Sequence, residues 1–220
     1  MIPQRFTGLP SGGTAATASF VLRVARMAAR GALRKPTLGT SGGPLFIGRG
    51  VRISNASHIH HRGRLVIEDG AEVQGLSSRG LVLGAEVSIG ARCMIRPSSY
   101  YGGEVGEGLR MGDRSSMASG CFIGCSGFIE IGDDVMLGPG VRLFAENHVF
   151  DDRSRTIKSQ GVRRGTVVIG DDCWLGSGAM VMSDVKIGAG VVVAAGSIVT
   201  EDVPDGVVVA GTPARIIRER

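Results

Sequence analysis

The fold is decided by residues 169–200, IGDDCWLGSGAMVMSDVKIGAGVVVAAGSIVT, in which aliphatic side chains recur every six residues. These positions are Ile169, Leu175, Val181, Ile187, Val193 and Val199. The fifth position of each hexad is also small or branched: Cys173, Ala179, Val185, Val191, Ser197 and Val203. An α-helix repeats at about 3.6 residues and a flat strand at about two, so a period of six predicts short strands joined by turns.

The same period returns upstream in fragments that are separated by slips of phase. The fragments are Ile47, Ile53, Ile59 and Leu65; Leu83, Ile89 and Ile95; Met111, Met117 and Ile123; and Ile131, Leu137 and Leu143. Three six-residue faces would close a triangular coil of about eighteen residues, and successive coils would stack as parallel strands roughly 4.8 Å apart. The pattern therefore predicts an all-β chain, a parallel β-helix of about seven coils between Ile47 and Val203, on the order of 30 Å tall.

The composition agrees with this prediction. The 36 Gly and 8 Pro residues exclude an ordinary helical bundle, and 43% hydrophobic residues exclude a disordered chain. Cys93, Cys121 and Cys173 occupy fifth positions, where we expect buried structural side chains, whereas Cys125 is off that phase. The cysteines lack zinc-site spacing, and neither a membrane-spanning run nor a signal peptide is evident. We therefore expect a reduced, cytoplasmic setting.

Residues 14–35 differ from the repeat because they are rich in Ala and end at Pro36, so they predict a helix. One basic stripe runs along it, with an apolar flank: Arg23, Arg26, Arg30 and Arg34, beside Leu22, Ala25, Ala29 and Leu33. No acidic residue precedes Glu68. The helix is expected to lie over the first coil, and the alternative is association with an anionic membrane surface or a lipid-phosphate acceptor. The rest of the chain has no nucleic-acid signature.

Three segments are expected: a basic segment and helix at 1–46, the β-helix at 47–204 and a closing segment at 205–220. The hexad disappears at 144–167, which predicts an excursion loop. His148 lies at the root of this loop, beside Asn147 and before Asp151 and Asp152. A β-helix has no cleft of its own, and a neutral imidazole can take a proton near neutral pH, so His148 is the candidate catalytic base.

A second histidine cluster is His58, His60 and His61. His58 and His60 flank the inward Ile59 and should point outward together, as a pair that could bind a metal. No third ligand lies at an obvious spacing, so a solvated surface is the favoured interpretation.

The run from Ile169 to Glu219 resembles the C-terminal half of the hexapeptide-repeat O-acetyltransferases. This left-handed β-helix family includes galactoside, maltose and polysaccharide acetyltransferases. Residues 147–161, NHVFDDRSRTIKSQG, resemble the loop of its polysaccharide-modifying branch. The resemblance implies a left-handed coil and a homotrimer with acetyl-CoA in the grooves between prisms. It also implies direct acetyl transfer to a saccharide hydroxyl in surface polysaccharide or glycolipid biosynthesis, with no metal.

The resemblance also assigns residues by position. His148 falls on the catalytic base, and Asn147 and Asp151 fall on the acceptor side. The cofactor positions are Trp174 at the pantetheine channel, Ser177 and Ala195 in the groove, Thr200 near the adenosine, and Arg215 and Arg218 at the phosphates. Trp174 is also expected to face outward from its place in the hexad, next to the inward Leu175.

Two positions depart from the family pattern. Glu201 replaces a common lysine, and its carboxylate would repel the 3′-phosphate of CoA, so it either turns away or leaves the phosphates to Arg215 and Arg218. Gly140 replaces the asparagine of galactoside acetyltransferases, which weakens a simple galactoside as the acceptor.

Three other functions stay open at this point. One is N-acetylation of an amino sugar with the same loop and cofactor. The second is a metal hydratase like the γ-type carbonic anhydrases, which share the fold but need three metal-binding histidines. The third is a non-catalytic assembly subunit.

Overall fold

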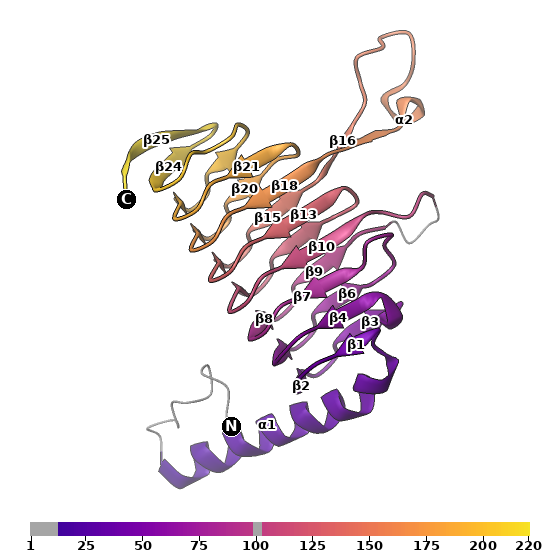
Figure 1. The fold of residues 1–220 in the computed structure, drawn as a ribbon, viewed down its shortest axis with the longest axis vertical. Coiled ribbons are helices and arrows are strands. Elements are labelled where there is room, and N and C mark those ends of the chain that lie inside the picture. The colour runs from indigo at the N-terminus through magenta and orange to yellow at the C-terminus, as the bar shows by residue number, and fades with distance from the viewer. Residues whose placement is uncertain (1–12, 99–102) are drawn as a thin grey trace.

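The structure is a computed structural model that describes residues 13–98 and 103–220. The chain winds through three parallel sheets, A, B and C, that form the faces of a prism (Figure 1). Sheet A contains β1 (Thr40–Ser41), β4 (Ile59–His61), β7 (Leu81–Leu83), β10 (Gly108–Met111), β13 (Phe128–Ile131), β18 (Thr166–Ile169) and β21 (Val185–Ile187). Its seven strands match the seven coils that the period predicts.

The other two faces continue each coil in the order A, B, C. Sheet B contains β2 (Leu45–Ile47), β5 (Leu65–Ile67), β8 (Val87–Ile89), β11 (Ser116–Met117), β14 (Met136–Leu137), β19 (Trp174–Leu175), β22 (Val192–Val193), β24 (Val207–Gly211) and the antiparallel β25 (Ala214–Glu219). Sheet C contains β3 (Arg52–Ser54), β6 (Glu72–Gln74), β9 (Met94–Arg96), β12 (Phe122–Gly124), β15 (Arg142–Phe144), β20 (Met180–Val181) and β23 (Ile198–Val199).

The hexad positions form the core. All six aliphatic side chains from Ile169 to Val199 are at most 1% exposed, and the predicted inward cysteines Cys93, Cys121 and Cys173 are buried. Cys125 is buried as well. The hydrophobic columns that stack from coil to coil therefore hold the prism together, since each coil buries its apolar residues only against its neighbours.

The length of a coil is the number of residues between register partners on neighbouring strands of sheet A. It differs from the predicted eighteen residues for every neighbouring pair but one. Val167 pairs with Val185, eighteen residues on, whereas Leu109 pairs with Ile129, twenty residues on. The turns from sheet A to B and from B to C keep the six-residue spacing throughout. Every added residue lies at the corner between sheets C and A, which we call the insertion corner. Cys125 belongs to one of these additions, which explains why it is off the phase.

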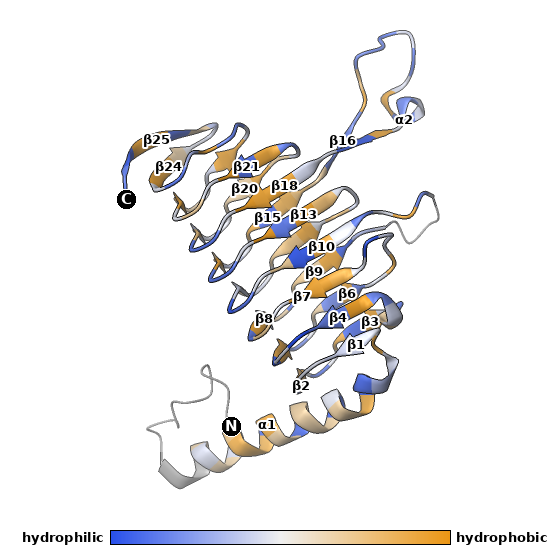
Figure 2. Ribbon diagram, in the orientation of Figure 1, coloured by the Kyte–Doolittle hydropathy of each residue, from blue (hydrophilic) through white to orange (hydrophobic). Residues whose placement is uncertain are grey.

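α1 (Gly13–Arg34) lies across the first coil, as predicted, and η2 (Lys35–Thr37) follows it (Figures 1 and 2). Met27 is 1% exposed and packs with Phe46 and Val66 of sheet B. A Cβ at Gly31 would lie 1.7 Å from the Leu45 carbonyl oxygen, so only glycine permits this close approach. The helix thus caps the hydrophobic columns at one end of the prism.

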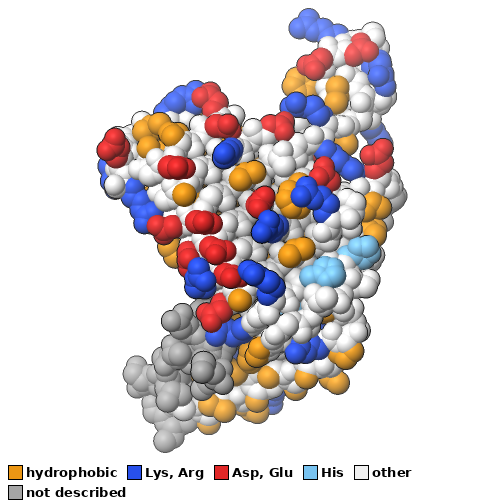
Figure 3. Space-filling model, in the orientation of Figure 1, with side chains coloured by type: hydrophobic (Ala, Val, Ile, Leu, Met, Phe, Trp, Pro, Cys, Tyr) orange, Lys and Arg blue, Asp and Glu red, His pale blue; other side chains and the backbone are white. Residues whose placement is uncertain are grey.

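The glycines in the second place of the hexads are needed for space and not for an unusual backbone angle. A Cβ at Gly132 would lie 2.2 Å from Oδ1 of Asp171 in the next coil. That oxygen accepts a hydrogen bond from the Asp133 N–H at 2.8 Å. The left-handed conformation falls instead on Asp134 and Asp172, with φ of 58° and 55°. Figure 3 shows the acidic side chains gathered along this edge, between sheets A and B, where they fix the turns of one coil to the next.

His61 differs from the expected solvated surface, because its side chain is 2% exposed in the same column as Leu83. It lies 2.6 Å from the Gly63 carbonyl through Nδ1 and contacts the Ser41 hydroxyl through Nε2. A carbonyl only accepts, so the neutral ring carries its proton on Nδ1. His58 and His60 remain partly exposed at η3 (Ala56–His58) and β4.

Lowering the pH should weaken the fold through His61. Burial, helped by the charge of Lys35, lowers the pKa of the imidazole below its usual 6.5, so the unfolded chain takes up this proton first as the pH falls. The contribution to stability is fully present above pH 6.5 and is lost below it. Urea unfolding on both sides of that pH should show the loss, and His61→Leu, which matches Leu83, should remove most of it. An unchanged pH dependence in the variant would contradict this role.

Within the described residues, no helix has the length and apolar character needed to cross a bilayer.

Candidate functional site

His148 lies on a two-stranded hairpin that leaves the prism at the insertion corner (Figure 1). The strands are β16 (Glu146–His148) and β17 (Val162–Arg164), and the short α2 (Ile157–Gln160) lies near the tip. His148 pairs with Val162 through the backbone, and its side chain is exposed. An exposed imidazole on a paired strand has a defined position and remains accessible to another molecule.

Two arginines of β17 fasten the root of this hairpin to neighbouring coils. Arg163 forms an ion pair with Asp184 at 3.1 Å, on the following coil. Arg164 donates to the carbonyl oxygens of Val105 at 2.9 Å and Glu104 at 3.0 Å, on the preceding excursion. The strand that pairs with His148 is therefore held from both sides.

The excursion that contains Glu104 and Val105 was not predicted from the sequence. It joins β9 to β10, and Leu81 of β7 pairs with Leu109 of β10, 28 residues on. The signal was present, because the hexad breaks between Ile95 and Met111. Both long excursions thus leave the same corner of the prism, two coils apart.

Asp151 and Asp152 follow His148 towards the tip, and both are exposed. Asp152 accepts hydrogen bonds from the Ser154 hydroxyl at 2.6 Å and the Ser154 N–H at 2.9 Å. These bonds lower the pKa of the Asp152 carboxyl, which makes Asp152 a weaker base than an ordinary aspartate. Asn147 is half-buried in β16, opposite Arg163.

Trp174 faces outward from sheet B, as the hexad predicts. It is 50% exposed, and Met136, its register partner on β14, is 54% exposed. Val192 continues this outward row on β22 and is partly buried. Two large apolar side chains exposed side by side form a contact surface for another molecule or another copy of the chain.

The remaining candidate cofactor positions are spread around the upper coils, and all of them are exposed. Ser177 and Ala195 lie in successive turns between sheets B and C, whereas Thr200 follows β23 towards the insertion corner. Arg215 and Arg218 lie on β25, which folds back onto β24. Glu201 forms an ion pair with Arg215 at 3.3 Å, so the carboxylate lies against one of the two arginines expected at the phosphates.

One chain does not bring His148 and the Trp174 surface together. The hairpin leaves the corner between sheets C and A, whereas Trp174 lies on sheet B, and Ser177 marks the corner between B and C. The width of sheet C therefore separates them, roughly 15 Å for about five residues of extended chain. On one prism the two surfaces are therefore separate.

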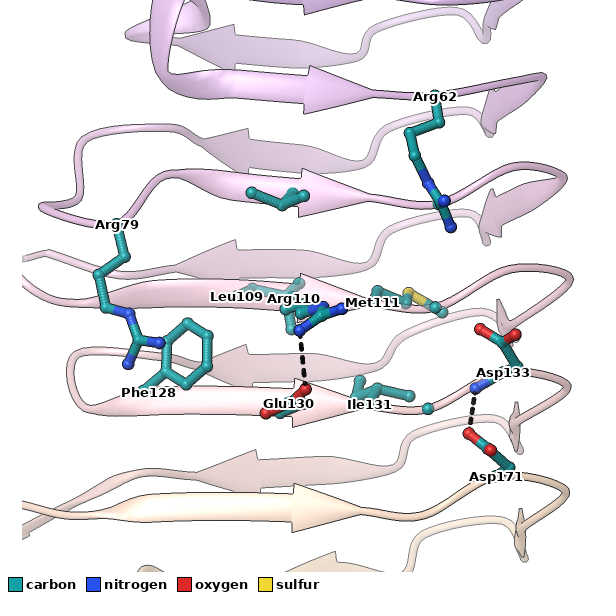
Figure 4. A pocket seen from close by; sticks show the side chains of 14 residues that line it. Arg62, Arg79, Leu109, Arg110, Met111, Phe128, Glu130, Ile131, Asp133 and Asp171 are labelled. Carbon is teal, nitrogen blue, oxygen red and sulfur yellow. Dashed lines mark hydrogen bonds and ion pairs between the residues drawn. The ribbon is translucent and has the colours of Figure 1, made fainter.

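A hollow of about 600 Å³ lies on the outer face of sheet A, and none of the predicted site residues lines it (Figure 4). Its charges are largely compensated. Arg110 pairs with Glu130 at 3.3 Å, and Arg62 pairs with Asp113 at 2.5 Å. The Arg79 guanidinium lies 3.4 Å from the centre of the Phe128 ring. This arrangement stabilises the face of the sheet.

No group of three or more His, Cys, Asp or Glu side chains within 13–98 and 103–220 is arranged to hold a metal ion. In the histidine cluster, His60 is hydrogen-bonded to the Thr40 hydroxyl at 3.1 Å, and Nδ1 of His58 donates to the Ser77 carbonyl at 3.1 Å.

Comparison with known proteins adds to this geometry. A family model for the bacterial transferase hexapeptide, six repeats long, matches residues 166–201. The chain carries the hexapeptide repeat of bacterial transferases. The matched residues run from β18 to the turn after β23, so they include Trp174, Ser177, Ala195 and Thr200.

Two curated relatives extend the similarity of this hexapeptide-repeat chain. A probable acetyltransferase of Mycobacterium tuberculosis is 30% identical over 164 residues, which are 74% of this chain and 52% of the relative. Galactoside O-acetyltransferase of Escherichia coli is 32% identical over 132 residues, 60% of this chain and 63% of the relative. The chain thus spans between about half and two thirds of the length of these two relatives.

The solved structures of similar shape include an N-acyltransferase of Bacillus cereus, a mutant bound to dTDP-4-amino-4,6-dideoxyglucose and coenzyme A. It is 20% identical, with a TM-score of 0.58 and coverage of 87% of this chain and 89% of that chain. At this identity the similarity shows the fold alone, which is the predicted left-handed parallel β-helix with an N-terminal helix.

Proposed function

We propose that this protein is an acetyl-CoA-dependent acetyltransferase that moves the acetyl group to a hydroxyl of a saccharide. The observation that carries the proposal is the exposed imidazole of His148 on a fastened hairpin, at the only corner of the described coils that takes insertions. The relatives named above support it, since one is named a probable acetyltransferase and the other a galactoside O-acetyltransferase.

The mechanism is a single acyl transfer. His148 takes the proton of the acceptor hydroxyl while that oxygen attacks the thioester carbonyl, and the imidazolium then protonates the departing thiolate of CoA. A backbone N–H in the groove holds the tetrahedral oxyanion. A covalent route through cysteine has no candidate, because all four cysteines are buried in the hydrophobic columns. Direct transfer to the acceptor is therefore the route that we propose.

The active unit is a homotrimer in this proposal, with each site built between two prisms. The separation of His148 from the Trp174 surface supports it, and so does the exposed apolar pair Met136 and Trp174, which a neighbouring prism would cover. We expect light scattering to give three times the mass of the chain. A monomer mass at assay concentration would contradict the trimer.

The donor side consists of Trp174 along the pantetheine, Ser177 and Ala195 in the groove, Thr200 near the adenosine, and Arg215 and Arg218 at the phosphates. Asn147 and Asp151 lie on the acceptor side, on either side of His148 along the hairpin. We place the reaction in surface polysaccharide or glycolipid biosynthesis, in the cytoplasm and at the inner face of the membrane.

Glu201→Gln should strengthen acetyl-CoA binding. The carboxylate pairs with Arg215 and would oppose a phosphate at the same guanidinium, so neutralising it frees Arg215. Because the pair is exposed, the gain should be modest, about fivefold in Kd. Calorimetric titration with acetyl-CoA measures it, and binding of dephospho-CoA should change less. Weaker acetyl-CoA binding in the variant would show that Glu201 does not oppose the phosphate.

A direct test of the function is release of free CoA from acetyl-CoA in the presence of saccharides. A panel of neutral oligosaccharides and amino sugars distinguishes O-acetylation from N-acetylation by the bond found in the product. Measurement of CO₂ hydration after loading with zinc tests the hydratase. Absence of CoA release with every acceptor, in a chain that binds acetyl-CoA, would favour the non-catalytic assembly subunit.

A further inference from the structure

α1 uses only one face to cap the prism. Val24, Met27 and Ala28 face the strands of the first coils, where they pack with Phe46 and Val66. Side chains two residues apart on a helix point in nearly opposite directions, so Leu22 lies on the other side from Val24. Capping the prism therefore leaves half of the helix surface exposed.

One stripe of the exposed surface of α1 is apolar. Its residues recur at spacings of three and four, and we call them the outer face of α1: Leu22, Ala25, Ala29 and Leu33. Leu33 is 81% exposed and Leu22 is 51% exposed, as is the adjacent Val21. Figure 3 shows apolar side chains along the edge of the molecule that α1 forms. Leucine side chains at these positions contribute little to folding, so the fold alone does not explain them.

The border of the outer face is basic. Arg26 and Arg34 are exposed beside it. Arg23 contacts Asp69 at 3.7 Å, and Arg30 donates to the Ile47 carbonyl at 2.7 Å. The sequence has no acidic residue before Glu68, so an anionic partner meets no negative charge on the helix. A second copy of the helix would bring these arginines against each other, which disfavours self-association through this face.

We propose that the outer face of α1 docks on an anionic lipid surface. Leu22 and Leu33 enter the boundary between headgroups and acyl chains, and Arg26 and Arg34 contact lipid phosphates. A single convex helix at the end of a prism fits a plane better than it fits a groove of another protein. The inference deepens the proposed function, since it brings a lipid-linked saccharide within reach, but its support comes from α1 alone.

Co-sedimentation of the full chain with lipid vesicles tests the proposal. One set contains phosphatidylcholine alone, and the other contains two parts phosphatidylcholine to one part phosphatidylglycerol. The protein should bind the second set, and added salt should weaken the binding. Leu22→Gln with Leu33→Gln should lower the partition coefficient about tenfold or more. Arg26→Gln with Arg34→Gln should lower it on the anionic vesicles by about tenfold.

A matched control carries the same kind of change at the far end of the molecule. Phe150 and Ile157 on the hairpin are 65% and 56% exposed, so Phe150→Gln with Ile157→Gln removes two similar apolar side chains. This variant should bind vesicles as the wild type does. Circular dichroism of all variants verifies that the substitutions at exposed positions leave the fold intact.

Four outcomes would overturn the proposal. The full chain fails to bind anionic vesicles, which would leave an acidic protein as the occupant of the outer face. The leucine variant binds as well as the wild type. The hairpin control alone loses binding. The protein binds both vesicle types equally and the arginine variant binds as the wild type does, which would show that the surface need not be anionic. If the wild-type chain binds anionic vesicles but transfers no acetyl group to a soluble acceptor, the proposed function is contradicted and the docking proposal is not.

Discussion

Replacing His148 by Ala should lower turnover by roughly 10²- to 10⁴-fold, which is the usual contribution of a general base. The imidazole is exposed and held on β16 by backbone pairing with Val162, which the substitution preserves. The dissociation constant of acetyl-CoA should stay nearly unchanged, because the base meets the acceptor and not the cofactor. Steady-state kinetics and calorimetric titration of the same preparation measure both quantities.

Asp151→Asn is the control for His148. Asp151 is an exposed carboxylate on the same hairpin, and an acceptor contact there would raise KM more than it lowers kcat. If His148→Ala kept more than about a tenth of wild-type turnover, with chemistry rate-limiting, His148 would not be the base. Asp151 would then be the next candidate, since hydrogen bonds from Ser154 lower the pKa of Asp152.

Replacing both Arg215 and Arg218 by Ala should raise the Kd of acetyl-CoA roughly 30-fold or more, because a charge-assisted contact with phosphate contributes about 1 to 3 kcal/mol. Both side chains are exposed on β25, so the prism should stay folded. Dephospho-CoA should lose less affinity than acetyl-CoA if one of these contacts is to the 3′-phosphate. Titration with both ligands distinguishes the two cases.

Arg220→Ala is the matched control for the double variant. Arg220 follows β25 directly, but it contacts Asp172 at 2.9 Å, at the edge between sheets A and B. Its loss should leave the Kd of acetyl-CoA unchanged within about twofold. Equal weakening by Arg220→Ala would indicate a general charge effect, and no weakening by the double variant would remove both arginines from the cofactor site.

The repeat in the sequence predicted the fold because each buried column depends on one residue type at one spacing. Ile169, Leu175 and Val181 recur every six residues because each occupies the inward position of one strand, and all three are buried. The outward position of Trp174 follows from the same geometry and is confirmed. The N-terminal helix was also predictable, because its composition differs sharply from the repeat and Pro36 ends it.

Other features depend on contacts between distant residues, which a period does not encode. The ion pair of Arg215 with Glu201 and the bonds of Arg164 to Glu104 and Val105 join separate segments. His61 was misjudged because a histidine is usually exposed, whereas here Ser41 and Gly63 provide its hydrogen-bond partners inside the column. The prediction of eighteen residues per coil was wrong for most coils. The extra residues all lie at one corner, and the turns at the other two corners keep their six-residue spacing.

Because the extra residues of the described coils all lie at the insertion corner, the length of the segment around His148 is independent of the shape of the surface around Trp174. Residues gained or lost between sheets C and A shift no buried column, because the strands on either side of both long excursions keep their register. The segment around His148 can therefore be lengthened, shortened or exchanged while the surface around Trp174 keeps its shape. A prism of this kind allows acceptor preference to change by loop replacement alone, with the donor side and the stability of the stack inherited intact.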